Sequence, residues 1–165
     1  MNKLKIVVIS DTHIPDRAKA LPEKLIEEIK NADMVIHAGD MVSLDFLNGL
    51  KSISKCLRAV CGNMDPEEIK KALPHKDIFK AGNFKIGLFH GFGAPNRIFE
   101  LLDSEFKNDK LDVVIFGHTH QVFNEKRNGA LFFNPGSATD KSCVECNTYG
   151  VIEINDKIQS RIVNI

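Results

Sequence analysis

Residues 113–120 read VVIFGHTH, an apolar run that stops at a glycine and is followed by two histidines. A short run of β-branched and aromatic residues bounded by glycine predicts a buried strand. The chain has only six histidines among its 165 residues, so a pair at the end of one strand needs an explanation. The ends of the other predicted strands supply it.

Five predicted strands in the first three quarters of the chain end in small residues and side chains that can bind metal ions. These side chains are, in chain order, Asp11 and His13 after strand 6–9, Asp40 after strand 34–37, Asn63 after strand 57–60, His90 at the end of strand 84–90, and His118 and His120 after strand 113–116. In open α/β sheets, ligands bind outside the carboxyl ends of the strands. Five distant segments can therefore meet at one rim.

This set of two aspartates, one asparagine and four histidines suits borderline divalent metals such as Mn, Fe, Zn, Co or Ni. Seven ligands exceed what one ion usually takes from a protein, and they fit two ions that share a bridging carboxylate. Two-metal sites with ions about 3.5–4 Å apart are a common device for displacement at phosphorus. Taken singly, each motif also has a structural explanation, such as a turn at Gly39-Asp40 or a hydrogen-bonded core histidine at position 90. The ordered combination favours a metal site.

The two halves of the chain differ in their predicted pairing. The first half alternates strands with helices over 21–30 and 43–50, which is typical of parallel sheets. Ser43 is expected to be the N-cap of the second helix. The second half has a helix over 95–106 and three two-residue turn signals, Gly82-Asn83, Asn128-Gly129 and Asn155-Asp156. Hairpins require antiparallel pairing, so we predict an α/β fold with mixed sheets. The length fits a single domain over residues 1–165.

Composition and charge exclude several classes of protein. The chain is 43% hydrophobic and 27% charged, and its 22 basic residues balance its 22 acidic residues, which leaves no charge footprint for nucleic acid or an anionic membrane. No apolar run approaches the roughly 18 residues of a membrane helix. The N-terminal apolar run meets Asp11 too early for a signal peptide, so we expect a cytoplasmic protein.

The ordered series D-x-H, G-D, G-N, H and G-H-x-H resembles the motifs of the calcineurin-like metallophosphoesterase superfamily. The stretch Asn134-Pro135-Gly136-Ser137 and the small size resemble its YfcE-type phosphodiesterase branch. The resemblance extends from Ile6 to the last predicted hairpin. It implies a four-layer αββα sandwich of two mixed β-sheets.

The resemblance also implies a role for each candidate ligand. It assigns Asp11, His13 and His120 to a first metal, Asp40 to the bridging position, and Asn63, His90 and His118 to a second metal. Asn63 is also expected to orient the substrate phosphate. We therefore expect two divalent ions per chain, with Mn as the first choice and Ni, Fe, Zn or Co as alternatives.

The expected activity is hydrolysis of a small phosphodiester by attack of a hydroxide bound between the two metals. Many superfamily members read G-N-H-[DE], where this chain has Gly62-Asn63-Met64-Asp65. Methionine has no proton to give, and general acid catalysis is typically worth about 10²–10⁴-fold. We therefore expect weak activity on monoesters. A homodimer is compatible with the small size of the chain.

Two other functions stay open on sequence grounds: a phosphomonoesterase acting on a small metabolite, and a non-catalytic metal-binding interaction scaffold. The presence of a competent ligand at all seven positions favours an enzyme. Four further features receive simpler interpretations. They are Cys143 and Cys146 as a disulfide or ordinary thiols, His37 as a core histidine, His75 as a surface residue, and Asp65 as the cap of a short helix.

Overall fold

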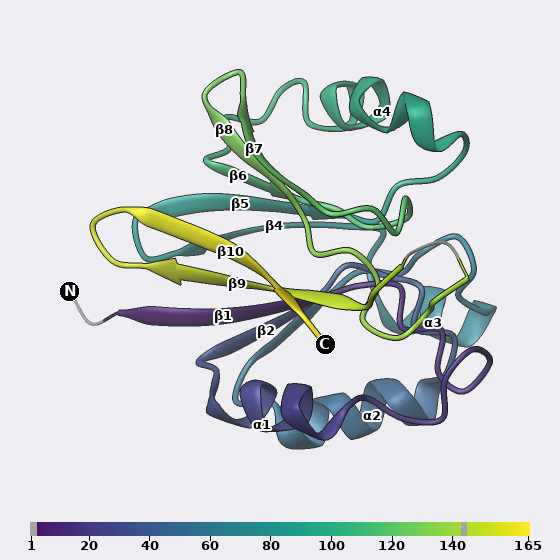
Figure 1. Ribbon diagram of the computed structural model, residues 1–165. Helices are drawn as coiled ribbons and strands as arrows, with labels where there is room; N and C mark the ends of the chain where they lie inside the picture. The colour runs from purple at the N-terminus through teal and green to yellow at the C-terminus, as the bar shows by residue number, and fades with distance from the viewer. Residues whose placement is uncertain (1–2, 143–144) are drawn as a thin grey trace.

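The computed structural model of the chain describes residues 3–142 and 145–165. Two five-stranded sheets lie face to face, and helices cover the outer faces (Figure 1). Both sheets contain parallel and antiparallel pairs, so the predicted αββα sandwich of two mixed sheets is confirmed. No helix among residues 3–142 and 145–165 is long and apolar enough to cross a membrane.

The first sheet has the strand order β10-β9-β1-β2-β3. Its strands are β1 (Leu4–Ile9), β2 (Met34–His37), β3 (Leu57–Ala59), β9 (Thr148–Ile154) and β10 (Ile158–Asn164). The strands β1, β2 and β3 run parallel, and the β9–β10 hairpin adds two antiparallel strands beside β1. Helices α1 (Glu23–Asn31) and α2 (Leu44–Ile53) lie against its outer face (Figure 1).

The second sheet has the strand order β4-β5-β6-β8-β7. Its strands are β4 (Lys76–Ala81), β5 (Phe84–Phe89), β6 (Val113–Ile115), β7 (Phe123–Arg127) and β8 (Ala130–Asn134). The two hairpins predicted here, β4–β5 and β7–β8, lie on either side of β6. The strand β6 runs parallel to its two neighbours, β5 and β8. Its outer face carries α4 (Ile98–Glu105), which follows a single 3₁₀ turn, η1 (Pro95–Arg97).

Alternation along the strands explains the layers. In β1, Ile6 and Val8 point into the core between the two sheets, whereas Val7 and Ile9 pack under α1 and α2. All four side chains are fully buried, as expected for a strand covered on both faces. A third core forms where α4 packs on the outer face of the second sheet. The serine cap predicted for α2 is confirmed, because the Ser43 hydroxyl accepts a hydrogen bond from the backbone N–H of Phe46.

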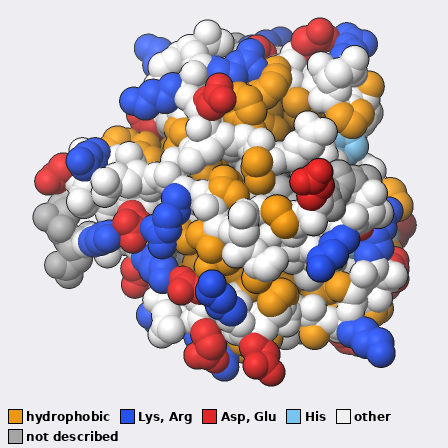
Figure 2. Space-filling view, viewed as in Figure 1, with side chains coloured by type: hydrophobic (Ala, Val, Ile, Leu, Met, Phe, Trp, Pro, Cys, Tyr) orange, Lys and Arg blue, Asp and Glu red, His pale blue; other side chains and the backbone are white. Residues whose placement is uncertain are grey.

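The surface agrees with the balanced charge. Lys and Arg side chains are interspersed with Asp and Glu side chains on the face that Figure 2 shows, without a large field of one sign.

The short helix α3 (Glu67–Ala72) follows the third ligand-bearing loop, between β3 and β4. The strands therefore leave one set of loops in which the candidate ligands can meet.

Candidate metal centre

The seven predicted ligands come together at one end of the sandwich, although they span residues 11–120. Asp11, His13, Asp40 and Asn63 follow strands of the first sheet, whereas His90, His118 and His120 follow strands of the second. The Oδ2 atom of Asp40 lies 3.2 Å from Nε2 of His90 and 3.8 Å from Nε2 of His13. The structure therefore brings loops of both sheets within the reach of a common set of ions.

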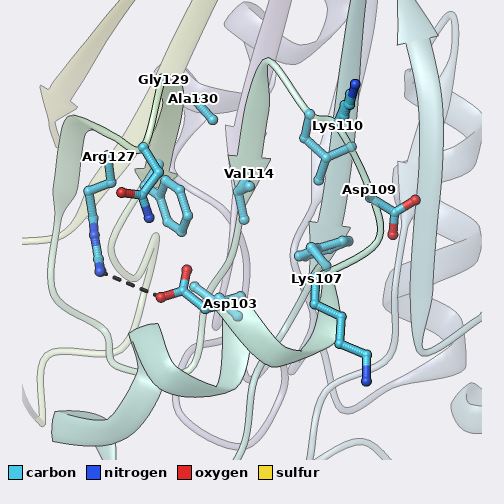
Figure 3. Close-up of a pocket in the computed structure, with 13 residues that line it drawn as sticks. Asp103, Lys107, Asp109, Lys110, Val114, Arg127, Gly129 and Ala130 are labelled. Carbon is cyan, nitrogen blue, oxygen red and sulfur yellow. Dashed lines mark ion pairs between the residues drawn. The ribbon is translucent and has the colours of Figure 1, made fainter.

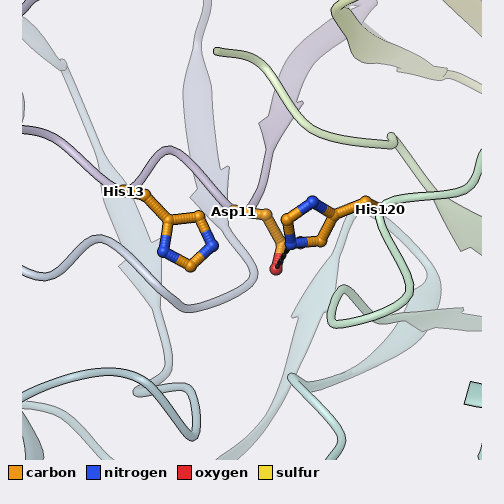
Figure 4. A group of neighbouring side chains, drawn as sticks. All are labelled: Asp11, His13 and His120. Atoms are coloured by element: carbon orange, nitrogen blue, oxygen red, sulfur yellow. Dashed lines mark ion pairs between the residues drawn. The ribbon is translucent and has the colours of Figure 1, made fainter. Parts of the chain in front are cut away.

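Two overlapping groups of ligand atoms can be distinguished. In one, Asp11, His13 and His120 offer atoms that all lie within 4.8 Å of one another, with the Asp11 carboxylate between the two rings (Figure 4). In the other, Asp11, Asp40 and His90 meet the same criterion. Asp11 thus belongs to both groups, whereas the resemblance assigns the bridging position to Asp40 alone.

Asn63 and His118 extend the second group. The Oδ1 atom of Asn63 lies 3.2 Å from Nε2 of His90 and 3.0 Å from Nδ1 of His118. The amide oxygen of Asn63 thus lies between two imidazole nitrogens. Close contacts therefore join all seven residues into one continuous cluster.

The protein holds one oxygen of each carboxylate and leaves the other to the cluster. The Oδ2 atom of Asp11 accepts hydrogen bonds from the hydroxyl of Ser10 and from the backbone N–H of His118. The Oδ1 atom of Asp40 accepts one from the backbone N–H of Met64, at 2.8 Å. The remaining oxygens, Oδ1 of Asp11 and Oδ2 of Asp40, face the histidines. This orientation fits the support that metal-binding carboxylates usually receive.

Unpaired buried atoms also fit a cation. Among the described residues, Oδ1 of Asp11, Nε2 of His13 and Nδ1 of His120 are buried without a hydrogen-bond partner. A buried polar atom without a partner costs about 1–3 kcal/mol, so Oδ1 of Asp11 and Nε2 of His13, which face the cluster, need a compensating group, whereas Nδ1 of His120 faces the Asp140 carboxylate. Carboxylate oxygens and imidazole nitrogens are ligands for borderline divalent metals. The donor set therefore fits the metal chemistry expected from the sequence.

The backbone of the ligand loops is strained. Seven non-glycine residues among those described have a positive φ, and five of them are the candidate ligands Asp11, His13, Asp40, His118 and His120, with φ between 43° and 68°. A non-glycine residue in this region costs about 1–3 kcal/mol and persists where the surroundings impose it. Such strain concentrates at functional sites, and here it directs side chains from tight turns into the cluster.

Glycine is required where two of the loops touch. A Cβ atom at Gly62 would lie 2.1 Å from Oδ1 of Asp40, and one at Gly117 would lie 2.1 Å from Oγ of Ser10. Real Cβ atoms do not approach so closely, so any side chain at either position would displace a carboxylate or the group that holds it. The glycines of the G-N and G-H-x-H motifs therefore let the loops pack closely enough to form the cluster.

Opposite charges adjust the titration of the buried groups. Burial by itself would raise the pKa of Asp11 and Asp40, but interactions with His90 bring the pKa of each below its ordinary value. Burial would lower the pKa of His90, but the two carboxylates raise it to about 9. For His13, burial prevails and lowers the pKa. Both carboxylates are therefore ionised at neutral pH and attract cations.

Several polar side chains outside the predicted set hold the ligand loops. His37 is buried, as predicted, and its ring joins the Thr12 hydroxyl to the backbone N–H of Gly39, at 3.0 and 3.1 Å. Burial lowers its pKa to about 3, so the ring is neutral. The Asn134 amide donates to the Gly117 carbonyl, and the Ser137 hydroxyl donates to the Asp11 carbonyl. The stretch N-P-G-S therefore ties the first and last ligand loops together.

Asp140 is a further residue that the sequence interpretation missed. Its carboxylate pairs with Arg17 and lies 3.5 Å from Nδ1 of His120. Burial would raise the pKa of Asp140, but hydrogen bonds from Ser142 and the charge of Arg17 bring it to about 2. A carboxylate beside the second ring nitrogen is the usual way in which a ligating histidine is oriented.

The contacts of Asp65 show that its predicted role as a helix cap is wrong. We expected it to cap α3, but the cap position is Pro66 and no side chain caps the helix. The buried Asp65 carboxylate instead accepts four backbone hydrogen bonds, from Asp40, Met41, Val42 and Gly62, at 2.7–3.0 Å. Four converging N–H donors outcompete a local cap. Asp65 therefore fixes the loops that carry Asp40 and Asn63.

We expect Asp65→Ala to lower the free energy of unfolding by about 3 kcal/mol, because it leaves four buried N–H groups without an acceptor. Urea unfolding monitored by circular dichroism measures the change. Glu67→Ala, an exposed acidic neighbour, is the matched control and should shift stability by less than about 0.5 kcal/mol. Equal effects of the two substitutions would contradict the role assigned to Asp65.

The remaining sequence interpretations concern residues outside the cluster. His75 is exposed, as predicted, with Nδ1 3.3 Å from Sγ of Cys61. Cys146 is an exposed free thiol, and Cys143 lies outside the described residues.

A separate cavity of about 610 Å³ lies between α4 and the β7–β8 hairpin (Figure 3). Asp103 and Arg127 point toward each other across it and form an ion pair of 3.8 Å. It adjoins the amino end of β6, whereas His118 and His120 follow the carboxyl end. None of the seven candidate ligands lines this cavity, so it does not belong to the metal centre.

A family profile described as the calcineurin-like phosphoesterase superfamily domain matches residues 4–157. The chain belongs to this superfamily. The match includes all seven candidate ligands and every strand of the two sheets except β10. The family resemblance stated from the sequence motifs is thereby confirmed.

Individual relatives of this phosphoesterase support its assignment to the superfamily. It is 37% identical over 164 residues to the probable metallophosphoesterase MJ0623 of Methanocaldococcus jannaschii, which covers 97% of this chain and 81% of the relative. It is 30% identical to the phosphodiesterase MJ0936 of the same organism, over 97% of this chain and 99% of the relative. The solved structure of Vps29 from Cryptosporidium parvum superposes with a TM-score of 0.77 at 25% identity, over 99% of this chain and 98% of that one.

Proposed function

We propose that this phosphoesterase is a metal-dependent phosphodiesterase with a dinuclear centre. The ligands we assign to it are Asp11, His13, Asp40, Asn63, His90, His118 and His120. The observation that carries the proposal is the position of two buried carboxylates, each with one oxygen facing histidines from two different loops. Two adjacent cations sharing carboxylate oxygens would occupy such an arrangement. We propose manganese as the first cation to test, with Ni, Fe, Zn or Co as alternatives.

When bound, the cations would polarise the phosphate and supply an activated water for displacement at phosphorus. The protein contributes position and charge. Because Oδ1 of Asn63 faces His90 and His118, its amide nitrogen remains to donate to a phosphate oxygen at the exposed edge of the cluster. The strained loops and the Asp65 contacts hold the ligands before substrate arrives, which reduces the reorganisation needed during the reaction.

The direct test uses the purified chain, Mn²⁺ and the diester bis(p-nitrophenyl) phosphate. We expect release of p-nitrophenol that depends on added metal and stops with a chelator. Metal analysis by mass spectrometry after loading should give about two ions per chain. One ion per chain with full activity would contradict the dinuclear assignment. No hydrolysis with any of the five metals would contradict the enzymatic one.

Met64 bears on the preference for diesters. It follows Asn63 at the site, and its side chain is 54% exposed, so it faces the solution beside the cluster. A thioether cannot protonate a leaving group. We expect Met64→His to raise the ratio of monoester to diester turnover at least about tenfold, which is less than the roughly 10²–10⁴-fold that a fully positioned general acid contributes. Met64→Leu is the matched control, and it should leave the ratio unchanged. If both variants behave alike, the leaving-group explanation is wrong.

The second candidate function is an interaction module that binds metal without hydrolysis. The exposed apolar side chains beside the ligand loops favour it, since such groups also mark contact surfaces. Metal content together with the diester assay separates the two. Stoichiometric metal without turnover supports the interaction module, and turnover supports the enzyme.

A further inference from the structure

The apolar side chains that the protein exposes are concentrated around the metal centre. Four large hydrophobic side chains are exposed in the described part of the chain, at positions 44, 64, 92 and 122. Met64, Phe92 and Val122 each follow a candidate ligand by one or two residues. Single exposed hydrophobic residues need no explanation, but three of four at the rim of one site do. They point to a partner or substrate with an apolar surface.

Phe92 is the largest of them and lines a defined cavity. This cavity has a volume of about 440 Å³, in the range of small-molecule sites. Its wall includes Asn63, His90, Phe92, Lys70, His75 and Glu105. Because Asn63 and His90 belong to both the wall and the ligand cluster, a phosphate at the centre would place one of its ester groups in the cavity.

The position of Phe92 is fixed from two sides. Its ring contacts the buried ring of Phe89 edge to face, with centroids 6.2 Å apart. Gly91 and Gly93 flank it with φ of 99° and 80°, a conformation that favours glycine. The Gly93 carbonyl lies 2.8 Å from Nε2 of His118, so the loop that carries Phe92 is attached to a candidate ligand. Phe92 is 56% exposed, so much of its ring remains open to a ligand beside the site.

The other walls of the cavity are polar and carry both signs of charge. Lys70 is half-buried on α3, and His75 is exposed with its Nδ1 beside the Cys61 thiol. The Glu105 carboxylate lies 3.0 Å from the ammonium of Lys76. Donors and an acceptor around an aromatic wall suit a flat ring with a polar edge better than an aliphatic chain.

We propose that this cavity binds a nucleoside ester group of the substrate, with its base stacked on Phe92. The inference deepens the proposed function and rests on it, since the phosphate must lie at the ligand cluster. Stacking tolerates different bases, because every base presents a π-face. The substrate class is then a nucleotide diester rather than an alkyl or lipid diester.

Direct binding tests the inference without requiring turnover. Isothermal titration calorimetry on the Mn²⁺-loaded chain compares adenosine and uridine 5′-monophosphates with ribose 5-phosphate, which lacks the base, and with phenyl phosphate, which lacks the polar edge. We expect at least one nucleotide to bind roughly tenfold more tightly than either reference compound. Equal affinities would overturn the inference. Phenyl phosphate binding as tightly as the nucleotides would overturn the assignment of a base.

Substitutions of Phe92 test whether its ring causes the preference for nucleotides. Phe92→Ala should reduce the preference for the nucleotide over ribose 5-phosphate to within about twofold, and Phe92→Tyr should retain it because the ring is preserved. Leu44→Ala is the control, because Leu44 is exposed and does not line this cavity. A preference unaffected by Phe92→Ala would overturn the role of that ring. Hydrolysis of bis(p-nitrophenyl) phosphate without nucleotide preference would refute only this inference, whereas nucleotide binding without hydrolysis would refute only the proposed activity.

Discussion

Asp40→Asn is expected to reduce metal-dependent diester hydrolysis at least about 10³-fold. Its Oδ2 atom is the one that faces both His13 and His90, and asparagine would replace the negative charge that we propose to bridge the two ions with a neutral amide. Metal polarisation at phosphorus is worth several kcal/mol, and each 1.36 kcal/mol is about tenfold in rate. Steady-state assays of kcat with saturating Mn²⁺ measure the loss.

Asp45→Asn is the matched control, because Asp45 is an exposed carboxylate at the start of α2. Its activity should lie within about twofold of wild type, as for a surface change remote from the site. Circular dichroism must show that Asp40→Asn retains the fold. A folded Asp40→Asn protein with near wild-type turnover would rule out the centre described above.

Divalent metal is expected to raise the midpoint of thermal unfolding by about 5–15 °C. At a metal concentration of 100–1,000 times Kd, binding to the native state alone adds about 2.7–4.1 kcal/mol. For a chain of this size, each kcal/mol shifts the midpoint by about 2–4 °C. The physical source is the neutralisation of two buried carboxylates, Asp11 and Asp40, and the partner that the metal gives to the unpaired Nε2 of His13. Differential scanning calorimetry with Mn²⁺ and then with excess chelator gives the shift and its reversal.

The double variant Asp11→Asn, His13→Ala should lose this metal-induced shift, because it removes atoms from both groups of ligands. Lys107→Ala, an exposed residue beside the cavity under α4, should keep it. A shift of equal size in the double variant would mean that the metal binds elsewhere on the protein.

Much of the fold follows from local patterns. The apolar run 6–9, the turn signals Asn128-Gly129 and Asn155-Asp156, and the Ser43 cap each act over a few residues, and the structure contains the strand, the hairpins and the helix they predict. The observed ends of the helices and strands differ from the predicted ends by no more than three residues. The region 95–106, predicted as one helix, begins instead with a 3₁₀ turn.

The supporting contacts of the site could not be predicted in the same way. Asp65 meets backbone groups 23–25 residues away as well as its near neighbour Gly62, and Ser137 bonds to a carbonyl 126 residues away. Such contacts depend on how two sheets pack, and no local pattern encodes that distance. The local rule for helix caps therefore gave the wrong role for Asp65. That the candidate ligands lie together could be predicted, because each follows a strand, and parallel strands end together.

The two sheets of the sandwich contribute unequal but complementary shares of the centre. Four of the candidate ligands follow strands of the first sheet and three follow strands of the second. An ion held there would link the two sheets through their loops. Hydrogen exchange in the metal-free protein should then become faster at the loop ends of β2 and β5 together, while the opposite end of the sandwich, where apolar side chains of both sheets pack, keeps its protection.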